Sequence, residues 1–459
     1  MLLQQSNKRL TKRQIDAHLA DHEKHVIQRQ TSRKTMTWQP MAQSTHSKNT
    51  VNPVRKIADA CQVAPNPEKS LIKLHLGDPS VGGMLPPAEE AVHAMHQSVE
   101  SHSFDGYGPA VGDLAARQAV VERYSTDAAP FTADDVILAS GCSHSLQMAI
   151  EAIADGGDNI LVPHPGFPLY STLCRPHGII DRAYKIDMEC EDGEVRIDLL
   201  QLETLIDENT KAIIVNNPGN PTGAVFSKQH LEEILEVASR HRLVIIADEI
   251  YGDLVYNGAV FHPIATLSPK VPVITCDGIA KRWMVPGWRL GWIIVHDRFS
   301  VLSEVKKGMV ALSQKIVGPC AIVQGALPSI LRDTPEEYFI RTRKVIEDNA
   351  NLVAGILADV PGLRTVLPQG AMYMMVAVDK HIYADDVTFC QNLIKEESVF
   401  CLPGQAFSAP GFFRLVLTSS PALMEEAAIR IKNYCLKTKL VSFSEDSSDE
   451  GCDTICDSE

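Results

Sequence analysis

The sequence lacks the features that mark membrane-spanning, secreted and metal-binding proteins. No apolar run among its 459 residues approaches the roughly 20 residues that cross a bilayer. The opening stretch MLLQQSNKRLTKRQ has no apolar core of the kind found in a secretory signal. The eleven cysteines form no CxxC pair and no Cys/His spacing typical of a zinc site. We therefore expect reduced thiols in a cytoplasmic protein with no bound metal and no membrane partner.

A mitochondrial presequence is the weaker alternative for the beginning of the chain. Residues 1–34 contain arginines and serines, as such leaders do, but they also contain Asp16, Asp21 and Glu23. Transit peptides are poor in acidic residues, so the cytoplasmic expectation is preferred.

Each end of the chain is poor in one kind of charge: acidic residues are few at the beginning, and basic residues are absent from 441–459. Residues 1–56 hold eleven Lys/Arg against three Asp/Glu, whereas residues 441–459 hold seven acids and no base, in a chain of net charge −14. A basic segment can bind nucleic acid, but no aromatic interleaving or binding motif accompanies this one. We therefore predict a disordered basic extension at 1–50, a disordered acidic tail at 439–459 and no nucleic-acid partner.

Between these ends, strand and helix patterns alternate. Short β-branched or apolar runs at 134–140, 159–167, 211–216 and 243–251 predict strands, and amphipathic stretches at 141–154 and 228–242 predict helices. Continuously apolar strands alternating with helices are typical of a mainly parallel sheet that helices cover on both faces. The predicted fold class is α/β.

After about residue 330 the pattern changes. A long polar helix is expected at 334–358, followed by short strands at 371–378 and 412–418 with helices between and after them. The predicted organisation is an N-terminal arm at 51–85 that joins the small domain, a large domain at 86–333, and a small α+β domain with its connecting helix at 334–438.

Polar residues gather where the predicted strands end. They are Ser140 and Gly141, the stretch 216–223 (NNPGNPTG), Asp248, and Lys281 in the turn that follows the strand at 271–276. Each has an ordinary structural explanation: a helix cap, a proline-fixed turn, a surface carboxylate and a snorkelling lysine. In parallel sheets, however, the carboxyl ends of the strands meet at one edge, where ligands bind.

Together these residues predict one site with four parts. They supply an anion cradle at a helix N-terminus, an amide aimed by prolines, a buried carboxylate and a desolvated lysine. Pyridoxal 5'-phosphate uses all four, because its phosphate needs the cradle, its aldehyde forms a Schiff base with the lysine, and a carboxylate keeps its ring nitrogen protonated.

The lysine lies in an unusually apolar stretch, GIAKRWMVPGWRLGW at 278–292, which holds three of the four tryptophans. Desolvation disfavours an ammonium ion, so these surroundings predict a neutral, nucleophilic amine at Lys281. The tryptophans are expected to pack in the core beside the site rather than to stack on the cofactor.

Three motifs make the family recognisable. NPGNPTG, ADEIYGDLV and GIAKRWMVPGWRLGW resemble the fold-type I aminotransferases of class I. SGCSHSLQ, VPHPGFPLY, DGYGPAVG, SQKIVGPCAIVQGAL and AMYMMVAV are similar to the tyrosine-specific branch of that family in animals. The resemblance covers roughly residues 35 to 438. It implies the transfer of an amino group from L-tyrosine to 2-oxoglutarate, as the first step of tyrosine and phenylalanine breakdown.

The resemblance also implies residue roles. Lys281 matches the Schiff-base lysine and general base, Asp248 the partner of the ring nitrogen, and Asn220 and Tyr251 the donors to the ring 3'-oxygen. Gly141, Cys142 and Arg289 match the phosphate-binding positions, and Phe167 matches the aromatic ring that stacks on the cofactor. Arg414 and Gly77 match positions at the substrate carboxylate. Tyr107 matches a tyrosine that contacts the phosphate of the partner subunit across a dimer interface. The implied assembly is a homodimer.

The sequence departs from the family pattern at Gly278, where many relatives have a phosphate-binding serine, and at Met284, which is usually smaller or aliphatic. The site residues are shared by enzymes with other substrates, so transamination of alanine or kynurenine and β-elimination stay open as alternatives. A catalytically silent protein on the same fold is a third reading, which the full set of site residues disfavours.

Overall fold

The structure is a computed structural model, and it describes residues 12, 13, 17, 19–21, 24, 38, 40–60, 62–80, 84–190, 193–268, 270–383 and 385–446. The chain forms two compact units, Met1–Ser47 and Lys48–Glu459. Most of the extension predicted at 1–50 lies outside the described residues. Where 1–50 is described it includes helix α2 (Thr45–Asn49), none of whose residues is buried, and the disorder expected for this segment stays a prediction.

An eight-stranded sheet forms the centre of the second unit. Its strands, in spatial order, are β2 (Val136–Ala139), β9 (Gly291–His296), β8 (Val273–Gly278), β7 (Val244–Asp248), β6 (Thr210–Asn216), β3 (Asn159–His164), β4 (Ile180–Asp187) and β5 (Arg196–Ile197). β8, β7, β6, β3 and β4 run parallel to one another, whereas β9 is antiparallel to β8 and β2, and β5 is antiparallel to β4. The expected mainly parallel sheet is confirmed.

Both faces of this sheet are covered because the apolar strand residues alternate between two cores. Ala212 and Ile214 of β6 pack in one cluster with residues of helix α6 (Cys142–Ile153). Ile213 and Val215 pack in the other with residues of helix α9 (Lys228–His241). A strand that is buried on both faces has a continuous run of apolar residues, as the sequence of β6 does.

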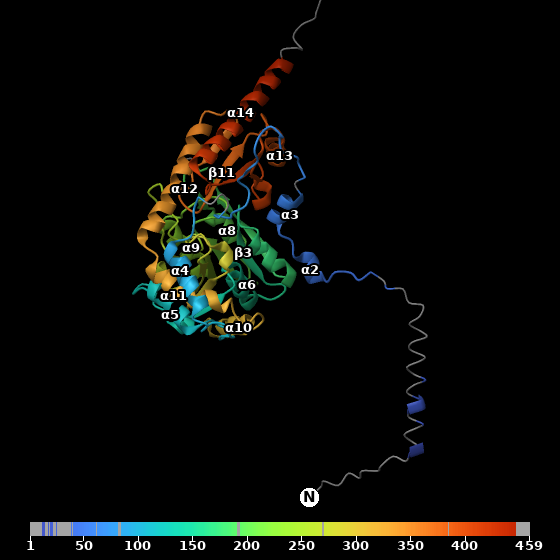
Figure 1. Cartoon of the computed structure of the whole chain (residues 1–459), viewed down its shortest axis with the longest axis vertical. Coiled ribbons are helices and arrows are strands. Elements are labelled where there is room, and N and C mark those ends of the chain that lie inside the picture. The colour runs from blue at the N-terminus through green and yellow to red at the C-terminus, as the bar shows by residue number, and fades with distance from the viewer. Residues whose placement is uncertain are drawn as a thin grey trace, which may run out of the picture. The chain divides into compact units, whose positions relative to one another are not determined.

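Figure 1 shows α4, α5, α10 and α11 together at one end of the body. Their bounds, with the short helices, are α3 (Pro53–Ala60), α4 (Glu89–Glu100), α5 (Leu114–Tyr124), α7 (Leu169–Cys174), α8 (Leu199–Thr204), α10 (Ser303–Ser313), α11 (Ala321–Asp333), η1 (Ala133–Asp135), η2 (Arg175–His177), η3 (Ile264–Leu267), η4 (Pro286–Trp288) and η5 (Gly404–Phe407).

A second, antiparallel sheet lies at the other end of the body, near α12 and α14 in Figure 1. Its strands are β10 (Leu363–Val366), β11 (Tyr373–Val378), β14 (Phe412–Val416) and β13 (Leu402–Pro403), and its helices are α12 (Glu336–Leu357), α13 (Asp386–Glu397) and α14 (Pro421–Asp446). β1 (Ile72–Lys73) pairs in parallel with β12 (Val399–Phe400) and so connects the early segment to this region.

The predicted domain limits stay a prediction, but one boundary needs correction. α14 continues to Asp446, so residues 439–446, which we expected in a disordered tail, are helical. Residues 439–446 (KLVSFSED) contain no proline or glycine to end a helix. The remainder of the predicted tail lies outside the described residues. None of the helices in the described part of the chain combines the length and the apolar character needed to cross a bilayer.

Candidate active site

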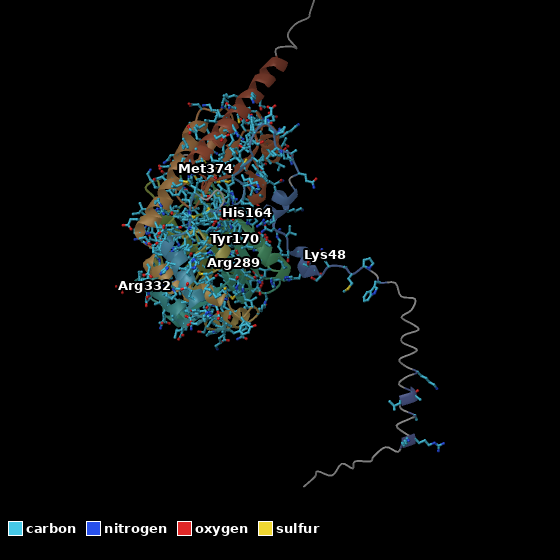
Figure 2. All side chains as sticks on the ribbon, in the orientation of Figure 1. Lys48, His164, Tyr170, Arg289, Arg332 and Met374 are labelled. Atoms are coloured by element: carbon cyan, nitrogen blue, oxygen red, sulfur yellow. The ribbon has the colours of Figure 1, made fainter. Side chains whose placement is uncertain are left out.

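A cavity of about 210 Å³ lies where β6 and β7 end and where the turn after β8 begins. Figure 2 shows Tyr170 and Arg289 near the middle of the body, with Met374, in strand β11 of the second sheet, above them. The lining comes from both sheets and from α3: Val54, Gly77, Cys142, Ser143, Leu146, Phe167, Asn216, Asn220, Asp248, Ile250, Tyr251, Ala280, Lys281, Pro286, Arg289, Tyr373 and Arg414. The structure thus brings most of the predicted site residues to one place.

The register of the parallel strands β6 and β7 places two polar residues of the site, Asn216 and Asp248, side by side. Asn216, the last residue of β6, pairs with Asp248, the last residue of β7. The Asn216 amide Nδ2 donates to the Asp248 carbonyl at 3.0 Å, and its Oδ1 accepts from the backbone N–H of Asn220 at 2.8 Å. The turn that carries Asn220 is therefore tied to the strand end that carries Asp248.

Asp248 is buried and surrounded by donors. The Tyr170 hydroxyl donates to its Oδ2 at 2.7 Å, and the Cys142 thiol lies 3.6 Å from its Oδ1. Burial raises the pKa of Asp248, and these donors oppose the rise without cancelling it. A cation placed beside this carboxyl group would favour its ionised form.

Lys281 reaches into the cavity from the turn after β8. Its Nζ donates to the Gly77 carbonyl at 2.5 Å and lies 5.9 Å from the centre of the Tyr251 ring. The side chain is half-buried, so the desolvation predicted from its apolar neighbours in the sequence is partial. Its tryptophan neighbours pack elsewhere: Trp283 and Trp292 are fully buried in the core, as expected, and Trp288 is partly buried against the same core.

Two tyrosine hydroxyls meet beside Lys281. Tyr251 and Tyr373 share a hydrogen bond of 2.7 Å, and both rings are buried. Gly77 lies against the same group, because a Cβ at this position would come within 2.2 Å of the Tyr373 hydroxyl. The absence of a side chain at Gly77 is thus what lets its carbonyl approach Lys281 and its Cα approach Tyr373.

Arg414 is a buried cation on β14. Its Nη1 donates to Asn220 Oδ1 and its Nη2 to the His75 carbonyl, both at 2.9 Å, and the guanidinium lies between the rings of Tyr373 and Phe407. Both oxygens are neutral, and Nε has no hydrogen-bond partner among the described residues. Burial lowers the pKa of Arg414. A carboxylate bound here would balance a desolvated positive charge.

The helix α6 begins at the wall of the cavity. Gly141 precedes its first turn with a φ of 78°, and Cys142 and Ser143 line the cavity. A Cβ at Gly141 would lie 2.4 Å from Nη2 of Arg289. Helix N–H groups and a guanidinium therefore converge here, an arrangement that favours an anion.

Close backbone approach explains the departure at Gly278. A Cβ there would lie 2.7 Å from the Leu290 carbonyl oxygen and 2.8 Å from the Gly291 Cα. Because β8 and β9 pair Gly278 with Gly291, a serine would force the two strands apart. Met284, the other departure, is buried in the main core.

The remaining predicted residues are Phe167 and Tyr107. Phe167 is partly buried at the cavity wall, edge-to-face with Tyr170. Tyr107 is 95% exposed and is not part of the cavity lining of its own chain. No group of three or more His, Cys, Asp or Glu side chains among the residues described could hold a metal ion.

The family model for aminotransferase class I and II matches residues 69–431. The chain belongs to this family. It is 70% identical to the tyrosine aminotransferase of Caenorhabditis elegans over 97% of this chain and 95% of that protein, and 48% identical to the mouse tyrosine aminotransferase over 85% of this chain and 86% of that one. Its fold matches the crystal structure of tyrosine aminotransferase from Leishmania infantum with a TM-score of 0.83 at 32% identity, covering 87% of this chain and 99% of that one.

Sequence reasoning missed three residues of this aminotransferase site. Tyr170, Tyr373 and Ser143 lie in stretches that carry the family resemblance, but their spacing gives no sign of the partners they contact. Tyr170 follows a Pro-Gly-Phe-Pro turn, and Tyr373 begins an apolar strand. Tyrosine hydroxyls need a partner when buried, which is the only general signal that could have identified them.

Proposed function

We propose that this aminotransferase transfers the amino group of L-tyrosine to 2-oxoglutarate, yielding 4-hydroxyphenylpyruvate and L-glutamate, and that it carries pyridoxal 5'-phosphate on Lys281. The observation that carries the proposal is the single cavity that joins Lys281, Asp248, the α6 N-terminus with Arg289, and the buried cation of Arg414. The near full-length likeness to proteins named tyrosine aminotransferase supports the choice of substrate.

The cavity residues fit the cofactor group by group. Asp248 is a buried carboxyl group with no cation at hydrogen-bond distance among the described residues, and a protonated ring nitrogen would supply one. The start of α6, with Cys142, Ser143 and Arg289, offers N–H groups and a cation for the phosphate. Pyridoxal phosphate supplies an electron sink that stabilises the negative charge left when the substrate loses its Cα proton.

The polar network sets which atoms face the cofactor. Asn220 Oδ1 accepts from Arg414, so its Nδ2 is the atom that can donate into the cavity. Tyr251, hydrogen-bonded to Tyr373, offers a second donor. In the proposal both donate to the ring 3'-oxygen, and the amine of Lys281 holds and moves the proton at the substrate Cα.

Arg414 is proposed to bind the α-carboxylate of the amino acid. Its planar fork can bond both carboxylate oxygens, and its Nε has no partner among the described residues. All amino acids have an α-carboxylate, so Arg414 cannot select among them. Selection of the side chain must come from the other residues that line the cavity. Val54, Leu146 and Ile250 offer the apolar surface that an aromatic ring requires. 2-Oxoglutarate would be held through neutral donors or a mobile cation.

A panel of amino donors with 2-oxoglutarate tests the substrate. We expect kcat/KM to be highest for tyrosine, good for phenylalanine and poor for aspartate. A higher kcat/KM for aspartate, alanine or kynurenine, or release of ammonia and an elimination product, would overturn the tyrosine assignment and leave the family membership intact.

Lys281→Ala tests the cofactor attachment. Borohydride reduction of the wild-type protein should fix the cofactor to the peptide that contains Lys281, whereas the variant should retain only cofactor that gel filtration removes. Undiminished steady-state transamination by Lys281→Ala would contradict the assignment.

The proposal extends to the assembly and the compartment. Tyr107 is almost fully exposed, which supports its contribution to the phosphate site of a second copy in a homodimer. Light scattering should give twice the chain mass, and a monomeric active enzyme would refute this part. A cytoplasmic role in tyrosine and phenylalanine breakdown is in keeping with the described cysteines, which are thiols rather than disulfides.

A further inference from the structure

Arg282 follows the lysine of the site but points to the other side of the turn. Its guanidinium is fully buried and is not part of the active-site cavity lining. It lines a separate cavity of about 390 Å³ together with Tyr124, Asp253 and Asp277. Neither the family motif nor the proposed chemistry gives Arg282 a role.

The guanidinium joins two different turns. Nη2 donates to Oδ2 of Asp277, which lies in β8 just before the turn that carries Lys281. Nη1 donates at 3.2 Å to Oδ2 of Asp253, which lies in the turn after β7, two residues beyond Tyr251. One side chain therefore connects the turn of the lysine to the turn of the tyrosine.

The connection is rigid on the Arg282 side. The guanidinium lies over the rings of Tyr124 and Trp283, at 5.3 and 5.4 Å from their centres. The other oxygen of Asp277, Oδ1, accepts the backbone N–H of Gly278 at 2.7 Å. The Trp283 indole donates to the Thr334 hydroxyl at 3.1 Å. Neighbours on several sides thus hold the fork in one orientation.

The connection is weaker on the Asp253 side. Burial raises the pKa of Asp277 to about 6, and the charge of Arg282 opposes this rise, so the carboxylate is ionised at neutral pH. Asp253, in contrast, has a side chain that is 52% exposed. Water at the Asp253 carboxylate screens this ion pair, so it contributes less to stability than the buried pair of Arg282 with Asp277.

Stability alone does not explain the arrangement. Burying a charge pair costs desolvation that its attraction often fails to offset, and an apolar replacement is frequently as stable. What the pair does supply is a fixed geometry between the backbone segments it connects. Those segments carry Lys281 on one side and Asp248 and Tyr251 on the other.

We propose that Arg282 is a positioning residue that, through Asp277 and Asp253, fixes the placement of the Tyr251 hydroxyl relative to Lys281. The inference rests on the proposed function, in which Tyr251 donates to the 3'-oxygen of the cofactor linked to Lys281. That donation favours the unprotonated form of the link between lysine and cofactor. A looser Tyr251 turn therefore raises the pH at which the link is half protonated.

Asp253→Ala is the decisive variant, because it cuts the Tyr251 side of the connection at a half-exposed position and leaves the buried pair in place. Asp333→Ala is the matched control: Asp333 also accepts from an arginine, Arg332, at 2.8 Å, its side chain is 44% exposed, and it does not line the active-site cavity. The readout is the pH midpoint of the visible absorbance of bound pyridoxal phosphate, which does not require turnover.

We expect Asp253→Ala to raise this midpoint by about half a pH unit, roughly a threefold change in proton affinity, with a fall in kcat and little change in KM. Asp333→Ala should leave both unchanged. Arg282→Lys, which keeps the charge and loses the two-pronged fork, should shift the midpoint in the same direction, and combining it with Asp253→Ala should add little. If Arg282→Lys does not fold, Asp253→Ala alone decides.

An unchanged midpoint in Asp253→Ala, while wild type shows a clear titration, would overturn the positioning role. An equal shift in Asp333→Ala would also overturn it, because the effect would then be one of surface charge. A wild-type protein that binds no pyridoxal phosphate at Lys281 would refute the proposed function itself, so the two failures are distinguishable.

Discussion

The Tyr170 hydroxyl donates a 2.7 Å hydrogen bond to Oδ2 of Asp248, across a separation of 78 residues. Tyr170 belongs to α7, next to the cavity wall at Phe167, and Asp248 ends β7. Both side chains are buried, so the bond orients the carboxyl group that is proposed to pair with the cofactor ring. An orienting donor of this kind matters because a mobile carboxylate would pair less well with a fixed cation.

Tyr170→Phe should therefore lower kcat by about tenfold to a hundredfold, the range for a hydrogen bond to a charged group. Tyr184→Phe is the control, since Tyr184 is equally buried and donates at 2.7 Å to the Ile214 carbonyl, away from the cavity. Equal losses of kcat in the two variants would show that Tyr170 acts only through general stability.

Asp248→Asn should separate turnover from binding. The amide keeps the shape of the side chain but removes the negative charge and replaces one of the two acceptor oxygens with an NH2 donor. We expect kcat to fall by about a hundredfold or more, the scale for loss of a preorganised electrostatic group, with a much smaller change in KM. Steady-state kinetics with tyrosine measure both. A large rise in KM with kcat preserved would assign Asp248 a structural role.

Gly141→Ala should weaken cofactor binding. The added Cβ would meet the Arg289 guanidinium at 2.4 Å and displace it from the start of α6. A positive φ also disfavours alanine by about 1 kcal/mol or more, so the control must share that strain. Gly157→Ala does, with a φ of 98° and open space around the new Cβ.

The affinity for pyridoxal phosphate, measured by titrating the apoprotein, should fall at least about tenfold further in Gly141→Ala than in Gly157→Ala. Matching losses in the two variants would mean that backbone strain, not displacement of Arg289, is responsible.

Glu249 predicts a pH dependence of stability. Burial raises the pKa of Glu249 to about 8, whereas an unfolded glutamate titrates near 4.5. Between these values the folded protein binds more protons at this position than the unfolded chain, so stability is lost as pH rises from about 4.5 to 8.

Glu249→Gln should remove this loss, because an uncharged amide can still accept the Ile264 N–H, which Glu249 Oε1 accepts at 2.9 Å. Denaturant unfolding should show the variant close to wild type at pH 5 and more stable by up to a few kcal/mol at pH 8. Glu236→Gln on the exposed side of α9 should show no such trend. A variant less stable than wild type at pH 8 would refute the argument.

Much of the central sheet could be predicted from the sequence, because continuous apolar runs have few ways to be buried. The strand expected at 211–216 is β6, and the helix expected at 228–242 is α9 with its end one residue earlier. The antiparallel course of β9 could not be predicted, since its apolar residues are compatible with either direction and pairing is decided by the path of the chain. The start of the acidic tail does not mark the end of the preceding helix, because α14 continues into the acidic stretch as far as Asp446.

The sequence by itself determined which residues could form the site. Asp248 and Lys281 stand directly after apolar strands, and strand ends in a parallel sheet meet at one edge, so their proximity follows from local pattern and general topology. The family motifs around them depend on the same local features.

Only the tertiary structure decided which partners complete the site. Tyr170 meets Asp248, Tyr373 meets Tyr251, and Arg282 connects two turns, because these contacts join elements far apart in the chain. It also decided that Lys281 is half-buried, since its apolar neighbours in sequence turn into the core while its own side chain turns into the cavity. A sequence pattern specifies which face a residue occupies, whereas the partner across that face is specified by how the elements pack.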